Sequence, residues 1–165
     1  MSRIITLLLL LSTAGCNLAE YRSSYLEQTR RVDNFLIGPQ FAAEDIAELT
    51  ELGVSAVINS RHPDEMKELK FDQARSLEQA GMTYLTAPLG GKEYPMSPAT
   101  LDRFSSAIKA AGSDGPVLLH CRSGRRSSLL LAAYLVREKG MTEEAAAEAV
   151  GQPELEKADI QKLLK

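Results

Sequence analysis

The chain has 165 residues, of which 44% are apolar and 25% charged, and its formal net charge is −3. This length suits one globular domain, and the composition excludes a chain that is disordered or membrane-spanning throughout. The slightly negative charge argues against non-specific binding to nucleic acid. Two histidines and two cysteines without zinc-binding spacing lead us to expect no metal and no cofactor.

The first fifteen residues have the three parts of a secretory signal. Arg3 gives a positive start, residues 4–11 form an apolar run, and small residues follow as far as Cys16. The run is too short to span a bilayer by itself. We therefore expect residues 1–15 to be a signal peptide of an exported protein.

The residues around Cys16 resemble the lipobox of bacterial lipoproteins, although Thr13 stands where that motif prefers leucine. The resemblance implies a lipid on Cys16 and a periplasmic or cell-envelope lipoprotein held at a membrane through its N-terminus. With Cys16 acylated, Cys121 would be the only thiol left. The alternatives are simple secretion, a chance cysteine, and a disulfide between the two cysteines, which would silence Cys121.

Residues 16–31 are polar and lack an apolar period, which predicts a tether, so we expect the catalytic domain to span residues 32–165. The first half of the domain alternates short apolar runs with amphipathic stretches. Strands are predicted at residues 35–37, 54–59 and 82–86, and helices at residues 43–52 and 71–80.

The second half begins after a loop rich in glycine and proline at residues 88–97. Helices are predicted at residues 97–111, 127–138, 142–150 and 154–164, and an apolar strand at residues 117–119. This alternation predicts an α/β domain with a central, mostly parallel sheet of about four or five strands flanked by helices.

A cysteine stands directly after the last predicted strand, in the octapeptide HCRSGRRS at residues 120–127. Ligands bind at the carboxyl ends of strands in parallel α/β sheets. The first amides of the next helix lack intrahelical partners, and Gly124 can take the positive φ that aims them at one point. The pattern predicts an oxyanion cradle in which positive charge favours the thiolate of Cys121.

Three arginines in this loop cannot all point inward. Arg126, at the start of the predicted helix, is best placed to grip two oxyanion oxygens with its planar fork. Arg122 and Arg125 are expected at the rim. The competing interpretation is a small core cysteine followed by a turn with solvated charges, which requires strand, cysteine, glycine, arginine and helix start to coincide by chance.

The octapeptide is similar to the active loop of cysteine-dependent phosphatases of the tyrosine and dual-specificity type, and it also resembles the loop of rhodanese sulfurtransferases. The segment FLIGPQFAAEDIAELTELGVSAVINSRHPDE, residues 35–65, resembles the beta-lactamase-hydrolase-like, dual-specificity-phosphatase-like family of bacteria. That family pairs a GQ segment after the first strand with an INxRPDxE segment after the second. The resemblance covers about residues 33–138 and implies a protein-tyrosine-phosphatase-like fold.

The resemblance implies a role for each residue of the loop. Cys121 would be the nucleophile that forms a thiophosphate intermediate, Arg126 would bind phosphate, and Ser127 would stabilise the leaving thiolate. His120 would order the loop and help to ionise the cysteine. The remaining phosphate-binding positions are Arg122, Ser123, Gly124 and Arg125, through their amides.

Phosphatases of this group use a loop carboxylic acid to protonate the leaving oxygen. Glu93, in a loop that the Gly90-Gly91 pair would allow to move, is the first candidate, and Asp64 is the other. Either carboxylate can equally be a solvated loop charge. His62 is expected only at the rim.

The main hypothesis is a phosphatase that acts on a phosphorylated substrate of unknown class. Four residues separate Cys121 from Arg126, whereas common tyrosine phosphatases have five. The shorter loop also fits a rhodanese-like sulfurtransferase that uses a Cys121 persulfide, although the preceding histidine argues against it. The third hypothesis is a non-catalytic anion-binding module, since no convincing acid is evident.

Overall fold

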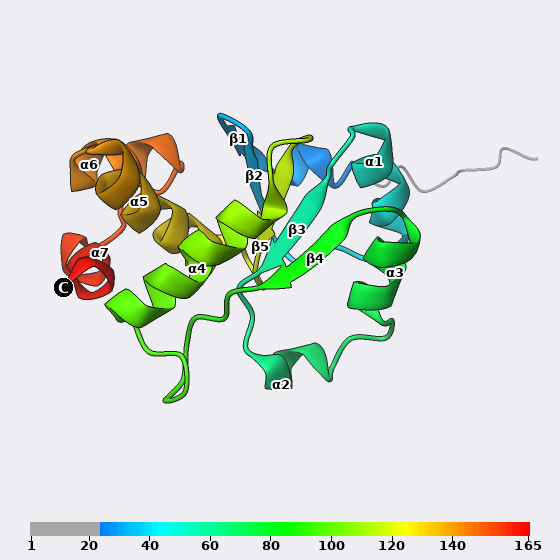
Figure 1. Ribbon diagram of the computed structural model, residues 1–165, viewed down its shortest axis with the longest axis horizontal. Coiled ribbons are helices and arrows are strands. Elements are labelled where there is room, and N and C mark those ends of the chain that lie inside the picture. Colours follow the sequence, from blue (N-terminus) through cyan, green and yellow to red (C-terminus); the bar gives the residue numbers. More distant parts are fainter. Residues whose placement is uncertain (1–23) are drawn as a thin grey trace, which may run out of the picture.

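The computed structural model describes residues 24–165 as an α/β domain around a five-stranded sheet of order β1-β2-β5-β3-β4 (Figure 1). The strands are β1 (Arg30–Val32), β2 (Phe35–Gly38), β3 (Ala56–Asn59), β4 (Thr83–Thr86) and β5 (Val117–His120). β1 pairs antiparallel with β2, and all other pairs are parallel. The predicted mostly parallel sheet is confirmed.

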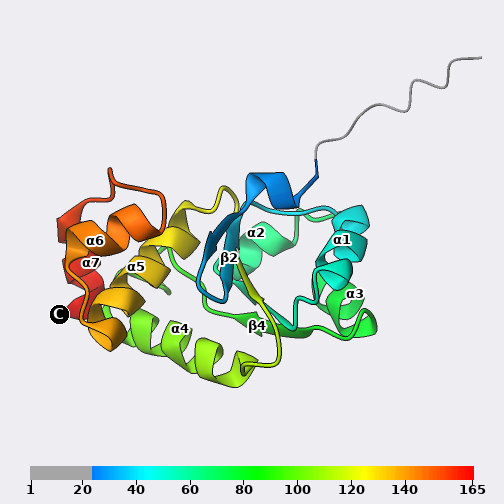
Figure 2. The ribbon, with the colours of Figure 1, turned by 90° about the horizontal axis from the view of Figure 1, so that it is seen from above.

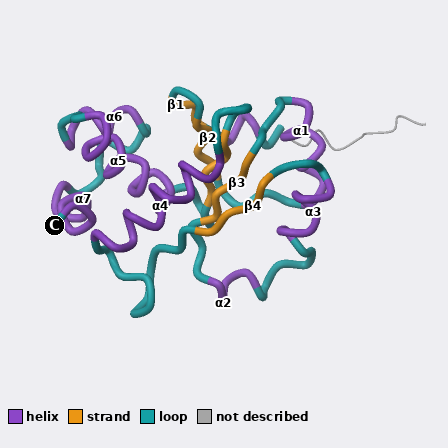
Figure 3. The backbone as a smooth tube through the Cα atoms, in the orientation of Figure 1, coloured by secondary structure: helices purple, strands orange, loops and turns teal. Residues whose placement is uncertain are grey.

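The central strand β5 carries the active loop at its carboxyl end. Leu118 pairs with Leu36 of β2 on one side and with Val57 of β3 on the other. Every residue of β3 and β5 is buried, because helices cover both faces of the sheet. Figure 3 shows these strands enclosed between two groups of helices.

The helices divide between the two faces of the sheet (Figures 1 and 2). On one side lie η2 (Ala43–Asp45), α1 (Ile46–Glu51) and α3 (Gln73–Gln79), and on the other α4 (Pro98–Ala111), α5 (Arg125–Lys139), α6 (Glu143–Ala149) and α7 (Lys157–Leu164). Neighbouring strand residues alternate between two apolar clusters: Leu118 packs with Leu49 in one, and Leu119 with Phe104 in the other. The two apolar clusters therefore bury both faces of β5, the strand that precedes the active loop.

The tether predicted for residues 16–31 is wrong over its last eight positions, 24–31. Tyr25 is only 2% exposed, its hydroxyl donates to the Pro39 carbonyl at 2.9 Å, and its backbone N–H donates to Glu48 Oε2 at 2.8 Å. The 3₁₀ helix η1 (Leu26–Gln28) and strand β1 follow. An edge strand that begins with two arginines is held by backbone pairing, which apolar periodicity does not reveal.

The predicted signal peptide and Cys16 lie outside the described residues. Between residues 24 and 165, no helix combines the length and the apolar character that crossing a bilayer would require.

Candidate active site

The active loop joins the end of β5 to the start of α5. Gly124 has a φ of +89°, and its N–H donates to Cys121 Sγ at 3.2 Å. Helix α5 begins at Arg125, two residues earlier than predicted, so Arg126 falls in its first turn. Cys121 is 1% exposed but belongs to neither apolar cluster. The sulfur is therefore buried beneath the loop, where the Gly124 N–H donates to it.

Arg126 is held with one edge of its guanidinium already occupied. Nη1 donates to Glu65 Oε1 at 2.6 Å and to the Leu89 carbonyl at 3.2 Å, and Nη2 donates to Glu65 Oε2 at 2.8 Å. A guanidinium has five N–H groups. Among the described residues, Nε–H and one Nη2–H have no oxygen partner. These two share the other edge of the fork, which matches two oxygens of an anion.

Glu65 is a site residue that the sequence interpretation missed. It lies in the short helix α2 (Pro63–Met66), inside a segment predicted as a loop. The hydrogen bond from Arg126 lowers the pKa of Glu65 to about 2, so the carboxylate is ionised at neutral pH. The available signal was the INxRPDxE resemblance, whose final glutamate corresponds to Glu65.

A chain of side-chain hydrogen bonds runs from Arg61 to His120, the residue before Cys121. Arg61 Nη1 donates to Gln40 Oε1 at 2.7 Å, and Gln40 Nε2 donates to Gln73 Oε1 at 2.8 Å. Gln73 Nε2 lies 2.8 Å from His120 Nε2. Since each amide uses its oxygen as acceptor, Gln73 donates, and His120 Nε2 must accept. The proton of His120 is thereby assigned to Nδ1.

His120 is fully buried, and desolvation lowers its pKa to about 3. Its imidazole is therefore neutral at physiological pH. The resemblance led us to expect a histidine that helps to ionise the cysteine. A neutral ring contributes no positive charge. It contributes hydrogen bonding and packing, including an edge contact with Phe41 in which the ring centroids are 5.0 Å apart. Positive charge at the loop comes from the arginines and the helix start.

Acid should destabilise the fold through His120. The unfolded side chain binds a proton near pH 6.5 but the folded one only near pH 3, so the free energy of unfolding falls as the pH drops between these values. One proton gives a slope of up to about 1.4 kcal/mol per pH unit. Urea unfolding at pH 7 and pH 4.5 should show a smaller decrease for His120→Gln than for the wild type. Equal decreases would contradict this assignment.

The other predicted loop residues are divided between the interior and the rim. The Ser127 side chain is fully buried, and its hydroxyl has no hydrogen-bond partner among the described residues. Arg122, Ser123 and Arg125 are exposed and line a cavity of about 320 Å³ beside Arg126. Arg122 and Arg125 therefore lie on the exposed lining of this cavity.

The two candidate acids, Asp64 and Glu93, lie on either side of the His62 imidazole. Asp64 Oδ2 lies 3.6 Å from His62 Nδ1, and Glu93 Oε2 lies 3.7 Å from His62 Nε2. Both carboxylates are about 70% exposed, at 69% and 72%. Asp64 also accepts from Lys67 at 2.7 Å, which holds the pKa of Asp64 below its usual range. Neither carboxylate has a hydrogen bond to Cys121 or Arg126 in the part of the chain that is described.

The family model described as "Beta-lactamase hydrolase-like protein, phosphatase-like domain" matches residues 29–135. The chain belongs to this family. The resemblance seen in the sequence is thereby confirmed.

Solved structures similar to this phosphatase-like domain include a candidate phosphatase of Neisseria meningitidis, at 27% identity over 79% of this chain and 90% of that one, with a TM-score of 0.58. PTPMT1 in complex with PI(5)P has 22% identity over 83% and 97% of the two chains and a TM-score of 0.65. TpbA of P. aeruginosa in complex with phosphotyrosine has 22% identity over 87% and 88% and a TM-score of 0.57. The last two show that the fold is that of the tyrosine phosphatases.

Proposed function

We propose that this chain hydrolyses phosphomonoesters with Cys121 as nucleophile. The observation that carries the proposal is the joint geometry of the loop. The Cys121 sulfur faces the Gly124 amide, while Arg126 keeps its Nε–Nη2 edge open beside it. Electrostatic interaction and a hydrogen bond with Cys121 both contribute to the raised pKa of Arg126, after the larger effect of the hydrogen bond with Glu65, so the sulfur lies within hydrogen-bonding reach of the guanidinium. A tetrahedral dianion is the ligand that such a combination of donors fits.

In the first step the Cys121 thiolate attacks phosphorus, an S–P bond forms, and the P–O bond to the alcohol breaks. The electron pair leaves with the alcohol oxygen, which takes a proton. In the second step water attacks phosphorus, the S–P bond breaks, and the thiolate is regenerated as phosphate leaves. Arg126 and the loop amides of residues 122–126 stabilise the negative charge throughout. The Ser127 hydroxyl, buried at the base of the loop, is assigned to the leaving thiolate.

Two other functions have specific support. The six-residue span from Cys121 to Arg126 favours a sulfurtransferase, in which the thiolate accepts a sulfane sulfur as a persulfide. The absence of a hydrogen bond between the loop and Glu93 or Asp64, within residues 24–165, favours a module that binds anions without turnover.

One set of assays separates these functions. The purified protein is offered an aryl phosphate, or thiosulfate with cyanide, under reducing conditions, beside a Cys121→Ser variant. We expect phosphate release that the variant loses. Thiocyanate formation instead would establish the sulfurtransferase. Bound phosphate without turnover of either substrate would establish the anion-binding module.

The cavity beside Arg126 indicates which phosphomonoesters would fit. Its lining combines the guanidinium groups of the loop with the apolar side chains Leu89, Met96, Leu129 and Leu155. At about 320 Å³ it is at the small end of ligand pockets. We assign it to an aromatic ring or a short alkyl group of the substrate alcohol. The ligands of two similar structures, phosphotyrosine and PI(5)P, support a phosphorylated substrate, and the first of them carries an aromatic ring.

Met96, 39% exposed in the lining of this cavity, provides the test. Met96→Ser should raise KM for an aryl phosphate about tenfold, because it removes apolar contact with the ring. It should leave KM for glycerol phosphate unchanged, since that substrate has no apolar group. Equal changes for both substrates would show that the alcohol does not occupy the cavity.

Export and lipid attachment at Cys16 also belong to the proposal, and they rest on the sequence alone. If Cys16 carries a lipid, Cys16→Ser should move the protein from the membrane fraction to the soluble fraction of the cell envelope. Unchanged membrane association would exclude this lipid as the anchor.

A further inference from the structure

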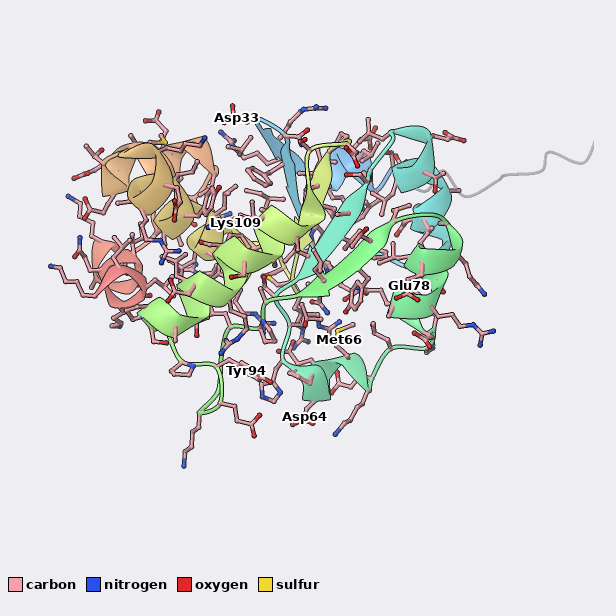
Figure 4. The ribbon with its side chains drawn as sticks, in the orientation of Figure 1. Asp33, Asp64, Met66, Glu78, Tyr94 and Lys109 are labelled. Atoms are coloured by element: carbon pink, nitrogen blue, oxygen red, sulfur yellow. The ribbon has the colours of Figure 1, made fainter. Side chains whose placement is uncertain are left out.

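His62 has no part in the mechanism described so far, although it lies at the edge of the site. It precedes α2 as its N-cap, where Nδ1 accepts from the Asp64 N–H at 3.2 Å. The side chain is 21% exposed, and its ring makes an edge contact with Tyr94, with centroids 5.5 Å apart. In Figure 4, Tyr94 and Asp64 lie close together although they come from different elements, the loop before α4 and helix α2. His62 is therefore enclosed between these two segments.

Two contacts place His62 next to the phosphate clamp. Glu65 Oε1 accepts from Arg126 Nη1 at 2.6 Å and also from the His62 N–H at 3.3 Å, so one carboxylate oxygen holds both residues. The loop of Gly90 and Gly91 passes both side chains. A methyl group on Gly90 would lie 3.9 Å from Arg126 Nη1, and one on Gly91 would lie 3.7 Å from His62 Nε2. Gly90 lines the substrate cavity, and His62 Nε2 lies beside the next residue, Gly91.

The charges around His62 come from two carboxylates, one beside each ring nitrogen. Asp64 faces Nδ1 and Glu93 faces Nε2, so a ring that carries both protons exchanges the hydrogen bond from the Asp64 N–H for a carboxylate at each nitrogen. Glu65 lies at its backbone, and Lys67 reaches the ring only through Asp64. Asp64 itself is a poor donor, because Lys67 keeps it ionised.

We propose that His62, rather than Glu93 or Asp64, donates the proton to the leaving oxygen. When the P–O bond breaks, the alcohol oxygen takes the proton from Nε2 and His62 becomes neutral. When water attacks the cysteinyl phosphate, the proton that water loses returns to Nε2. Glu93 and Asp64 are positioning residues that stabilise the protonated ring. This assignment rests on the proposed phosphatase function, whose own test is the loss of activity in Cys121→Ser.

The dependence of the rate on the leaving group tests the assignment. A nitrophenolate leaves without a proton, whereas an alkoxide needs one. In the full chain, His62→Asn should reduce kcat/KM for an alkyl phosphate about a hundredfold and kcat/KM for p-nitrophenyl phosphate less than threefold, because kcat/KM reports the step in which the alcohol leaves and not the later hydrolysis of the cysteinyl phosphate. Asparagine is a good N-cap, so α2 should remain intact. Glu93→Gln should show the same selectivity with a smaller loss.

Each other result has a distinct meaning. Equal losses on both substrates would show that His62 only supports the structure, and the assignment would fail. A selective loss in Glu93→Gln that equals or exceeds that of His62→Asn would give the proton to Glu93 and overturn it. A wild-type protein that releases phosphate from neither substrate would refute the phosphatase function itself.

Discussion

Arg126→Lys is expected to reduce kcat/KM for an aryl phosphate by about a hundredfold to a thousandfold. Lysine keeps the positive charge but loses the planar fork. In the wild type one edge of that fork is occupied by Glu65, and the Nε–Nη2 edge is open for two phosphate oxygens. A lysine ammonium that pairs with Glu65 cannot present two parallel donors to the substrate at the same time. Steady-state kinetics of purified wild type and variant measure the loss.

Arg122→Ala is the matched control, because Arg122 belongs to the same loop but its side chain is exposed at the rim. Its carbonyl, which accepts from the Gln40 N–H at 3.2 Å, is kept in the variant. We expect its kcat/KM to fall less than tenfold, the effect of a rim charge on substrate encounter. If Arg122→Ala reduced kcat/KM as much as Arg126→Lys does, the clamp would be wrongly assigned.

Glu65→Gln should reduce kcat/KM by about tenfold to a hundredfold, although Glu65 does not contact the substrate in this mechanism. Its carboxylate accepts from Arg126 Nη1 and Nη2 and from Arg61 Nε, the last at 3.3 Å. Glutamine offers one oxygen, and its NH₂ group would face a guanidinium donor. Arg126 would then lose the partner that orients it.

The effect of Glu65→Gln should not depend on pH over an ordinary assay range. The folded-state pKa of Glu65 is about 2, so its contribution is complete above the unfolded value of about 4.5 and is lost only as the pH falls toward 2. Weaker inhibition by phosphate would accompany the loss of rate. The control is Glu68→Gln, an equal charge change at an exposed site of the same segment. Similar losses in both variants would point to net charge instead of orientation.

The parts of this protein that the sequence determined are those in which the information is local. The all-apolar stretch of β5, the cysteine directly after it and the glycine before α5 lie within a few consecutive residues. Backbone hydrogen bonding and burial follow from such short patterns. The loop and the places of Cys121 and Arg126 in it could therefore be predicted from the sequence.

The parts that were missed depend on residues far apart in the chain. Arg126 and Glu65 are 61 positions apart, and Gln73 and His120 are 47 apart. Strand β1 was also missed, because an edge strand beginning with Arg30 and Arg31 has no apolar pattern to detect. No local period encodes which carboxylate meets a given guanidinium.

Only the tertiary structure determined that Arg126 pairs with Glu65 and Gln73 with His120, because the order of the strands in the sheet brings these distant segments together. β3 lies directly beside β5, with Asn59 paired to His120 and the Ser60 N–H bonded to the His120 carbonyl. The segment after β3 must therefore leave the sheet beside the active loop. This brings Glu65 to Arg126 and His62 to the edge of the site. Sequence chemistry supplied the charged groups, and the strand crossover determined which of them meet.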